Sequence, residues 1–163
     1  MDRGPRFPAF VDGTPEAIAW VVRRMRAEAR LDCELCSHFS TLDEFLVNRI
    51  AVGGPKWAIE LEGEPVAVGG LVPGLPGVHE AWICATDRVQ LLAPRYLVKA
   101  CRLVIKGMFE YPDVRRIQAT VRAPWEAANR FALAAGLKYE GQLQAVCRNW
   151  SAVNVYAIVK GQK

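Results

Sequence analysis

The chain has 163 residues, of which 52% are hydrophobic and 23% are charged. This length fits one domain over residues 1–163 with a buried core, and the composition excludes a disordered chain. The net charge of +4 is small and its basic residues are scattered, which argues against a nucleic-acid-binding protein. Because no apolar run resembles a membrane span or a signal peptide, we expect a protein that is neither membrane-bound nor secreted.

The N-terminal part of the sequence predicts a strand and then a helix. Residues 6–11 favour an edge strand, since prolines are tolerated there and not in a central strand. Thr14 as N-cap and Pro15 at the first helical position begin a helix that we expect to continue to residue 31. Its inward-facing side chains follow helical spacing: Ile18, Val21, Val22 and Met25.

A second helix and three strands are predicted next. Thr41 and Glu44 form a capping box at the start of a helix over residues 40–52. Three strands then follow in quick succession, over residues 56–63, 64–72 and 79–86. The first two strands are joined by a tight turn around Gly63 and Glu64, so they predict a hairpin.

The second half of the sequence alternates helices and strands. A long helix carries an apolar face of Leu97, Cys101, Val104, Ile105 and Met108. The remaining elements are a strand over residues 115–122, a helix over 124–136, and two strands over 137–146 and 154–160. The helix begins at Pro124, and Gly136 caps its C-terminus.

This order of elements predicts an α/β fold, with one mixed sheet of about seven strands and helices on both faces. The order is β-α-α-β-β-β-α-β-α-β-β. Because a crossover helix joins the fourth and fifth strands, we expect these two strands to be parallel neighbours.

The five cysteines of the sequence are interpreted as small buried apolar residues of a reduced protein. Cys33 and Cys36, followed by His38, were considered as a metal site. A structural zinc needs four ligands, and no second pair of ligands follows at a usable spacing, so we expect no metal. A redox role for this Cys-x-x-Cys pair is also disfavoured, because the pair lies between two helical segments.

The order of elements resembles that of the GNAT N-acetyltransferase superfamily along nearly the whole chain. The most specific match is VRAPWEAANRFALAAGLKYEGQL, residues 121–143, which resembles the fifth strand, fourth helix and sixth strand of that family. The positions that the family favours are occupied here by Ala128, Phe131, Gly136, Leu137, Glu140 and Gly141. These are mainly packing and capping residues, so the resemblance implies the fold more than the activity.

The resemblance also implies a site for acetyl-CoA between the fourth and fifth strands. In the family, the pyrophosphate lies on a glycine-rich turn that opens the third helix. The corresponding segment here, LLAPRYLVKA (residues 91–100), has no glycine, and Pro94 removes an N–H donor. We therefore expect that no cofactor binds; if acyl-CoA does bind, the resemblance implies contacts with Ile83, Cys84, Ala85, Arg88, Arg95 and Tyr96.

The catalytic groups that the resemblance implies are incomplete. The tyrosine that often protonates the departing thiolate is replaced by Ala132, and an asparagine found earlier in the same helix is replaced by Trp125. Glu80 and Asp87, at the two ends of the fourth strand, are the candidate general bases. Each could equally be a solvated carboxylate at the end of a strand.

A closer resemblance is to the small GNAT-like proteins of short-tailed phages. It is carried by VAVGGLV, by WICATDRVQLL with Thr86-Asp87, and by the basic helix that follows. That group is associated with the virion interior and with particle assembly. It implies a non-catalytic protein of the virion or host cytoplasm that contacts other virion or assembly proteins and can form homo-oligomers. Trp125 and Trp150 are the residues that we expect on the partner surface.

Two other interpretations stay open. One is an active N-acetyltransferase that uses acetyl-CoA and an amine acceptor, with Glu80 or Asp87 as its base. The other is a nucleic-acid-associated module that would bind through Arg23, Arg24, Arg26, Arg115 and Arg116. The scattered positions of these basic residues disfavour it.

Overall fold

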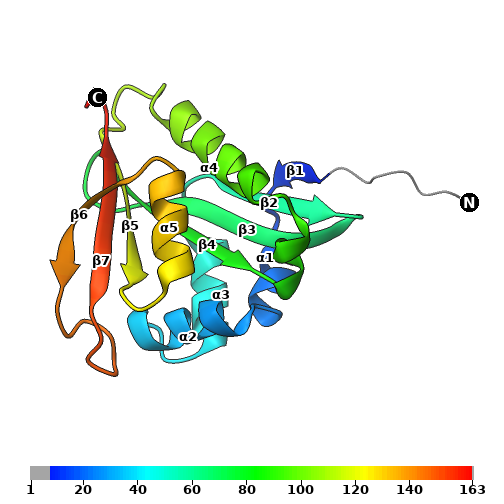
Figure 1. Cartoon of the computed structure of the whole chain (residues 1–163). Helices are drawn as coiled ribbons and strands as arrows, with labels where there is room; N and C mark the ends of the chain where they lie inside the picture. The colour runs from blue at the N-terminus through cyan, green and yellow to red at the C-terminus, as the bar shows by residue number, and fades with distance from the viewer. Residues whose placement is uncertain (1–7, 163) are drawn as a thin grey trace, which may run out of the picture.

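The computed structural model describes residues 8–162, which form a seven-stranded sheet (Figure 1). Its strands are β1 (Ala9–Asp12), β2 (Lys56–Leu61), β3 (Glu64–Pro73), β4 (Val78–Ala85), β5 (Arg116–Arg122), β6 (Lys138–Leu143) and β7 (Val153–Val159). Their order across the sheet is β1-β2-β3-β4-β5-β7-β6. β1 is the expected edge strand, although Arg6 and Phe7 lie outside the described residues.

The strand pairing confirms the expected mixed sheet. β4 and β5 are parallel, and the other neighbouring strands are antiparallel. β2 and β3 form the expected hairpin, in which the turn residues Glu62 and Gly63 both have positive φ, 59° and 78°. A turn with two positive φ values matches the twist of the strands that it joins.

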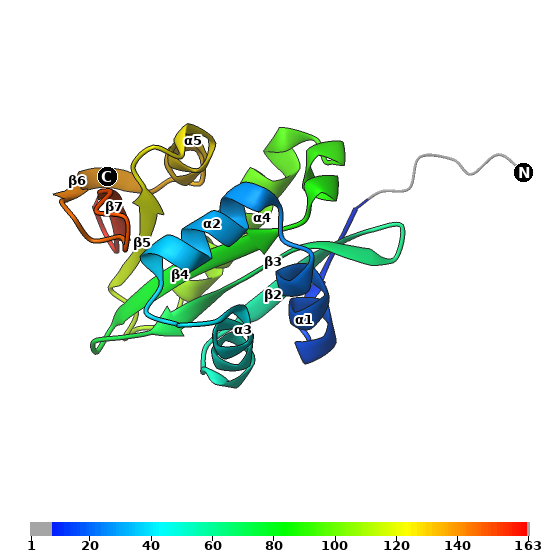
Figure 2. The same ribbon diagram turned by 90° about the horizontal axis from the view of Figure 1, so that it is seen from below.

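Helices lie on both faces of the sheet, as predicted (Figure 2). They are α1 (Pro15–Arg23), α2 (Ala27–Cys36), α3 (Leu42–Ala51), α4 (Pro94–Met108) and α5 (Glu126–Ala134), and the 3₁₀ turn η1 (Asp87–Leu91) precedes α4. α1, α2 and α3 share one core with the inner strands, which includes Ile18, Val21, Val22, Phe45, Val68 and Cys84. α4 and α5 cover the other face. Among the described residues, no helix is long and apolar enough to cross a membrane.

The single helix expected over residues 14–31 is wrong, because the chain breaks it into α1 and α2. Met25 forms an isolated antiparallel bridge with Thr86, and the N–H of Arg26 donates to the Ala85 carbonyl at 2.9 Å. This short pairing with the end of β4 uses backbone groups that a continuous helix would use internally. The predicted inward face is still buried, and Met25 is 6% exposed.

Helix capping follows the sequence closely. The Thr14 hydroxyl accepts a hydrogen bond from the Ala17 N–H at 3.2 Å, and the Thr41 hydroxyl accepts from the Glu44 N–H at 3.1 Å. The Glu44 carboxylate in turn accepts from the N–H of Ser40 at 2.8 Å. The capping box is therefore confirmed, with its return bond one residue earlier than expected.

The boundaries of α5 agree with the prediction at one end only. Gly136 has a φ of 102° and caps the helix, as expected. At the other end the helix begins at Glu126, and Trp125 is its N-cap residue, so the predicted start at Pro124 is two residues early.

Two adjacent glycines in β3 make room for two tryptophans on opposite faces of the sheet. A Cβ atom on Gly69 would lie 2.3 Å from Cζ2 of Trp57, and one on Gly70 would lie 2.8 Å from Nε1 of Trp82. Trp57 belongs to the core under α4, whereas Trp82 packs against the core of α1, α2 and α3. The glycine pair therefore has a packing role on both sides of β3.

We predict that Gly69→Ala lowers the free energy of unfolding by at least about 1–3 kcal/mol, the usual cost of overpacking a core. Gly107, in α4, is the matched control, since a Cβ atom there meets nothing within 4 Å. Gly107→Ala should raise the free energy of unfolding by up to about 1 kcal/mol through its effect on backbone entropy. Urea unfolding of both variants tests the pair, and equal stabilities would contradict the packing role of Gly69.

Candidate functional site

The two central strands separate after three paired residues. β4 and β5 pair only through Val78 with Arg116, His79 with Ile117 and Glu80 with Gln118. Beyond these pairs a cavity of about 420 Å³ opens between the strands, lined from both faces of the sheet. Its walls come from α2 and α3 on one side and from α4 and α5 on the other.

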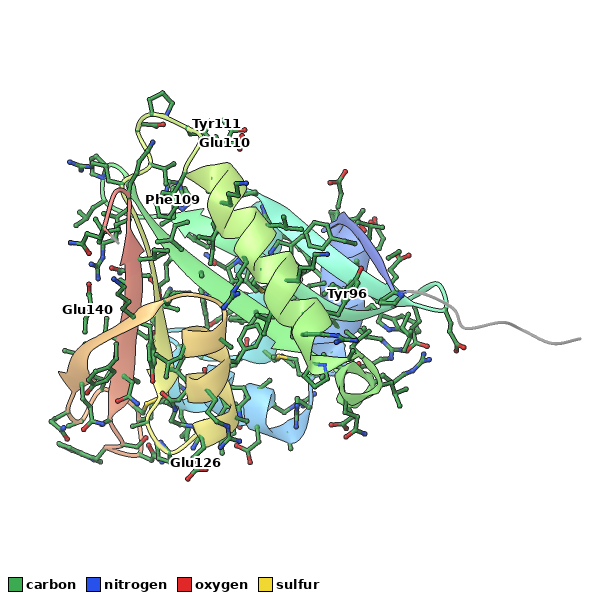
Figure 3. All side chains as sticks on the ribbon, turned by 45° about the horizontal axis from the view of Figure 1, so that its top comes forward. Tyr96, Phe109, Glu110, Tyr111, Glu126 and Glu140 are labelled. Carbon is green, nitrogen blue, oxygen red and sulfur yellow. A yellow bond between two sulfur atoms is a disulfide. The ribbon has the colours of Figure 1, made fainter. Side chains whose placement is uncertain are left out.

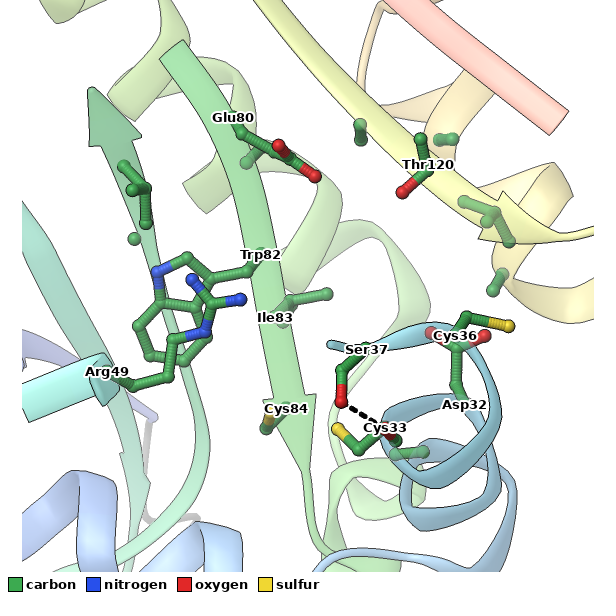
Figure 4. A pocket seen from close by; sticks show the side chains of 18 of the residues that line it. Asp32, Cys33, Cys36, Ser37, Arg49, Glu80, Trp82, Ile83, Cys84 and Thr120 are labelled. Carbon is green, nitrogen blue, oxygen red and sulfur yellow. Dashed lines mark hydrogen bonds between the residues drawn. The ribbon is translucent and has the colours of Figure 1, made fainter. Parts of the chain in front are cut away.

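The polar groups of the cavity lie on the side of α2 and α3. Glu80, Trp82 and Cys84 share one face of β4, because alternate residues of a strand point the same way. In Figure 4, the Glu80 carboxyl group and the Thr120 hydroxyl point into the gap from β4 and β5. Arg49 of α3 reaches over the Trp82 ring from the opposite side (Figure 4).

Arg49 is surrounded by aromatic rings. Its guanidinium carbon lies 4.9 Å from the ring centre of Phe45, 5.4 Å from that of Trp82 and 5.9 Å from that of Phe39. Burial lowers the pKa of Arg49, while nearby groups, among them Glu80, act in the opposite direction.

Ion pairs of the buried Arg122 side chain link α2 to the end of β5. Arg122 is 7% exposed; its Nη2 lies 2.9 Å from Oε2 of Glu28, and its Nε lies 3.8 Å from Oδ1 of Asp32. Burial raises the pKa of Asp32, and the interaction with Arg122 only partly opposes that shift. These ion pairs hold α2 along the cavity, where Asp32 and Arg122 are both lining residues.

A disulfide between Cys36 and Cys147 joins the C-terminus of α2 to the loop between β6 and β7. The interpretation of the cysteines as mostly small buried apolar residues of a reduced protein is therefore wrong for this pair. Two hydrogen bonds support the same contact: the Arg148 N–H donates to the Leu35 carbonyl at 2.8 Å, and its guanidinium donates to the Phe39 carbonyl at 2.7 Å. Within residues 8–162, no group of three Cys, His, Asp or Glu side chains is placed to bind a metal.

The three free thiols differ in acidity. The Cys84 thiol donates a hydrogen bond to the Cys33 sulfur, which lowers the pKa of Cys33 and, together with burial, raises that of Cys84. Burial alone raises the pKa of Cys101 to about 12.

The turn before α4, where the resemblance placed a pyrophosphate, uses its polar groups internally. The N–H of Tyr96 donates to the Ala93 carbonyl at 2.8 Å, and Pro94 has no N–H. The Tyr96 hydroxyl donates to the Pro8 carbonyl at 2.8 Å, which ties the start of α4 to the chain before β1 (Figure 3). Arg88 is paired with Glu62 and Glu64.

The predicted site residues fall into two groups. Glu80, Ile83 and Cys84 line the cavity. The others lie outside its lining: Ala85, Asp87, Arg88, Arg95 and Tyr96. Asp87 is an exposed residue of η1, so the structure does not bring the two candidate bases together.

The two tryptophans expected on a partner surface also separate. Trp125 is half-buried, lines the cavity and packs against the core of α1, α2 and α3. Its placement therefore differs from the exposed surface that was expected. Trp150 is 82% exposed.

Sequence reasoning missed Arg49, Asp32 and Thr120 as cavity residues. One signal for Arg49 was present: it follows the inward-facing Phe45 by four residues on the predicted helix, so it shares the apolar face. A charged residue on the inward face of a helix is unusual, and here it lies there because that face lines the cavity.

We predict that iodoacetamide modifies Cys33 first, because its lowered pKa gives it the largest thiolate fraction. Cys101 is the internal control: its pKa of about 12 should keep it unmodified at pH 7.5 in the folded protein. Peptide mass mapping after timed alkylation, without reductant, measures both sites. Modification of Cys101 as fast as Cys33 would contradict the prediction.

Comparison with known proteins extends this picture. No family model matches the sequence, and no curated protein matches it closely enough to count as a relative. A ribosomal-protein-alanine N-acetyltransferase from Brucella melitensis has a similar structure, with a TM-score of 0.68, 16% identity, and coverage of 93% of this chain and 99% of that one. An acetyltransferase of the GNAT family from Streptococcus pneumoniae has a TM-score of 0.66, 16% identity, and coverage of 95% and 100%.

A third similar structure contains a ligand. It is a ribosomal L7/L12 α-N-protein acetyltransferase in complex with coenzyme A, with a TM-score of 0.69, 12% identity, and coverage of 93% of each chain. Such low identities establish the fold alone. The expected fold is confirmed: this chain has the fold of the GNAT acetyltransferases.

Proposed function

We propose that this protein is an acyl-CoA-dependent N-acyltransferase that transfers an acetyl group to an amine. The observation that carries the proposal is the separation of β4 and β5 after Glu80, which opens a cavity through the sheet. A cavity lined from both faces lets the two substrates approach the same point from opposite sides. The coenzyme A complex of a structurally similar acetyltransferase supports this choice.

The cavity suits the acyl-carrying end of acetyl-CoA. On the side of α4 and α5 its lining is largely apolar, and includes Ile83, Cys101, Val104 and Phe131. Acetyl-CoA supplies the acyl group as a thioester. The turn before α4 suits the pyrophosphate less well, since Pro94 has no N–H and the N–H groups of Leu92 and Tyr96 already donate to carbonyls of the chain. We therefore expect acetyl-CoA to be held mainly by apolar contacts inside the cavity and by positively charged side chains near its pyrophosphate.

Glu80 is the proton acceptor in this proposal. Its carboxyl group lies on the cavity wall where β4 and β5 begin to separate, so it can take the proton that an amine loses as the new C–N bond forms and the C–S bond breaks. The thiolate leaving group has no phenol at the position of Ala132. Tyr156, which is 3% exposed, donates its hydroxyl to Oδ1 of Asn129 at 2.7 Å. We therefore expect the thiolate to be protonated by solvent.

A non-catalytic role through protein contacts is the second candidate. One observation favours it: the turn before α4 has Pro94 and the internally bonded Tyr96 where the family presents free amides. The partners in this case would be other virion or assembly proteins. The similar structures described above are acetyltransferases, and they give no support to the virion setting.

We predict that acetyl-CoA binds in isothermal titration calorimetry and that a panel of primary amines includes an acceptor. With that acceptor, Glu80→Gln should lower kcat by about 100-fold or more, the range of a lost general base, and leave acetyl-CoA binding unchanged. Asp87→Asn is the matched control, because Asp87 lies outside the cavity lining. Absence of both binding and transfer would reject the enzyme and favour the second candidate.

A further inference from the structure

Arg49 is a charged group inside the cavity that has no hydrogen-bond acceptor. Its Nε is buried, and no atom of residues 8–162 accepts a hydrogen bond from it. No carboxylate in the described part of the chain lies within ion-pair distance of its guanidinium group. Its guanidinium group lies against the aromatic rings of Phe39, Phe45 and Trp82.

This arrangement is costly unless a ligand completes it. Arg49 is half-buried, so the cost falls mainly on its Nε, which is removed from water without a hydrogen-bond partner. Contacts with aromatic faces return about 0.5–2 kcal/mol. A guanidinium group also carries five N–H donors in a planar fork that matches a carboxylate. Burial lowers the pKa of Arg49, and a bound anion would oppose that shift as Glu80 already does in part.

The position of Arg49 connects it to the proposed chemistry. It packs over Trp82, and Glu80 lies two residues earlier on the same face of β4 (Figure 4). Both Arg49 and Glu80 line the cavity on the side of α2 and α3. Arg122 and Asp32 also line this side but face each other. Arg49 and Glu80 remain as one positive and one negative group, a pattern complementary to a zwitterion.

Other charged groups of this wall are already engaged. The Nε of Arg122 and Oδ1 of Asp32 also lack a hydrogen-bond partner, but Arg122 has two carboxylates beside it, Glu28 at 2.9 Å and Asp32 at 3.8 Å. The free thiols of Cys33 and Cys84 interact with each other through a hydrogen bond. Arg49 is thus the cation of this wall that remains available to a ligand within the described structure.

We propose that the α2–α3 side of the cavity binds a small amine that also carries a carboxylate, with the carboxylate on Arg49 and the amino group toward Glu80. The acetylation of the bound amine rests on the proposed function, whereas its binding at Arg49 does not require acetyl transfer. The cavity volume of about 420 Å³, shared with the acyl donor, favours a compact molecule. Arg49 is then a residue that determines specificity for the acceptor.

The test uses glycine, β-alanine and γ-aminobutyrate, which vary the separation of the two charges, each compared with its own amide. Calorimetry measures binding to the full-length protein, and a thiol-release assay with acetyl-CoA measures transfer. We expect at least one acid to bind about 10- to 100-fold more tightly than its amide, the effect of hydrogen bonds to a charged group.

Arg49→Met removes the charge and keeps a long side chain, whereas Arg49→Lys keeps a point charge. Arg49→Met should abolish the preference for the acid over the amide, and Arg49→Lys should retain part of it. If Arg49 had a purely structural role, its substitution would weaken the binding of acid and amide by the same factor, and the ratio of the two affinities would not change. Urea unfolding of both variants checks that the fold is intact.

The outcomes separate the two proposals. Arg49-dependent binding of an acid without transfer would support the carboxylate site and reject the acetyltransferase. Transfer to amines with equal preference for acids and amides would support the acetyltransferase and overturn the carboxylate site. Failure of every acid to bind would also overturn it.

Discussion

The separation of β4 and β5 is the constraint on which the rest of the structure depends. Each strand keeps a full ladder on its outer side: β4 pairs with β3 as far as Ala85, and β5 pairs with β7 as far as Arg122. These outer ladders keep the two strands in the sheet after their mutual pairing has ended at Glu80 and Gln118. The cavity is therefore maintained by the flanking sheet, and inner backbone groups that lack a strand partner are left facing it.

The position of α2 beside the cavity is fixed by an ion pair of a buried arginine and by a disulfide. Arg122 is buried beside Asp32, whose raised pKa shows that burial outweighs the attraction between the two groups. Ion pairs of a buried group are weak evidence for stability. The role of this pair is to fix the position of α2. Together with the disulfide between Cys36 and Cys147, this ion pair fixes α2 against β5 and against the β6–β7 loop, so that α2 forms one wall of the cavity.

Local rules of sequence predicted much of this fold, and long-range contacts account for the differences. The caps at Thr14 and Thr41 and the β2–β3 hairpin depend on residues within a few positions of each other. The break between α1 and α2 depends on a bridge from Met25 to Thr86, and the disulfide spans 111 residues. No local pattern encodes either contact. The same limit applies to the site. Glu80 could be recognised from its position at the start of a strand. Arg49 lines the cavity because it packs over Trp82, which is distant in the sequence.

The cavity and the turn before α4 differ in the polar groups that they leave without hydrogen-bond partners. At the turn before α4, Pro94 lacks an N–H, and the amide and hydroxyl groups of Tyr96 already have acceptors within the chain. At α3, the buried Nε of Arg49, a cavity-lining residue, has no acceptor among residues 8–162. A ligand gains most from groups that the folded chain has desolvated without pairing. Polar recognition is therefore concentrated on the α2–α3 side, and the turn before α4, whose sequence first suggested a phosphate site, contributes mainly packing.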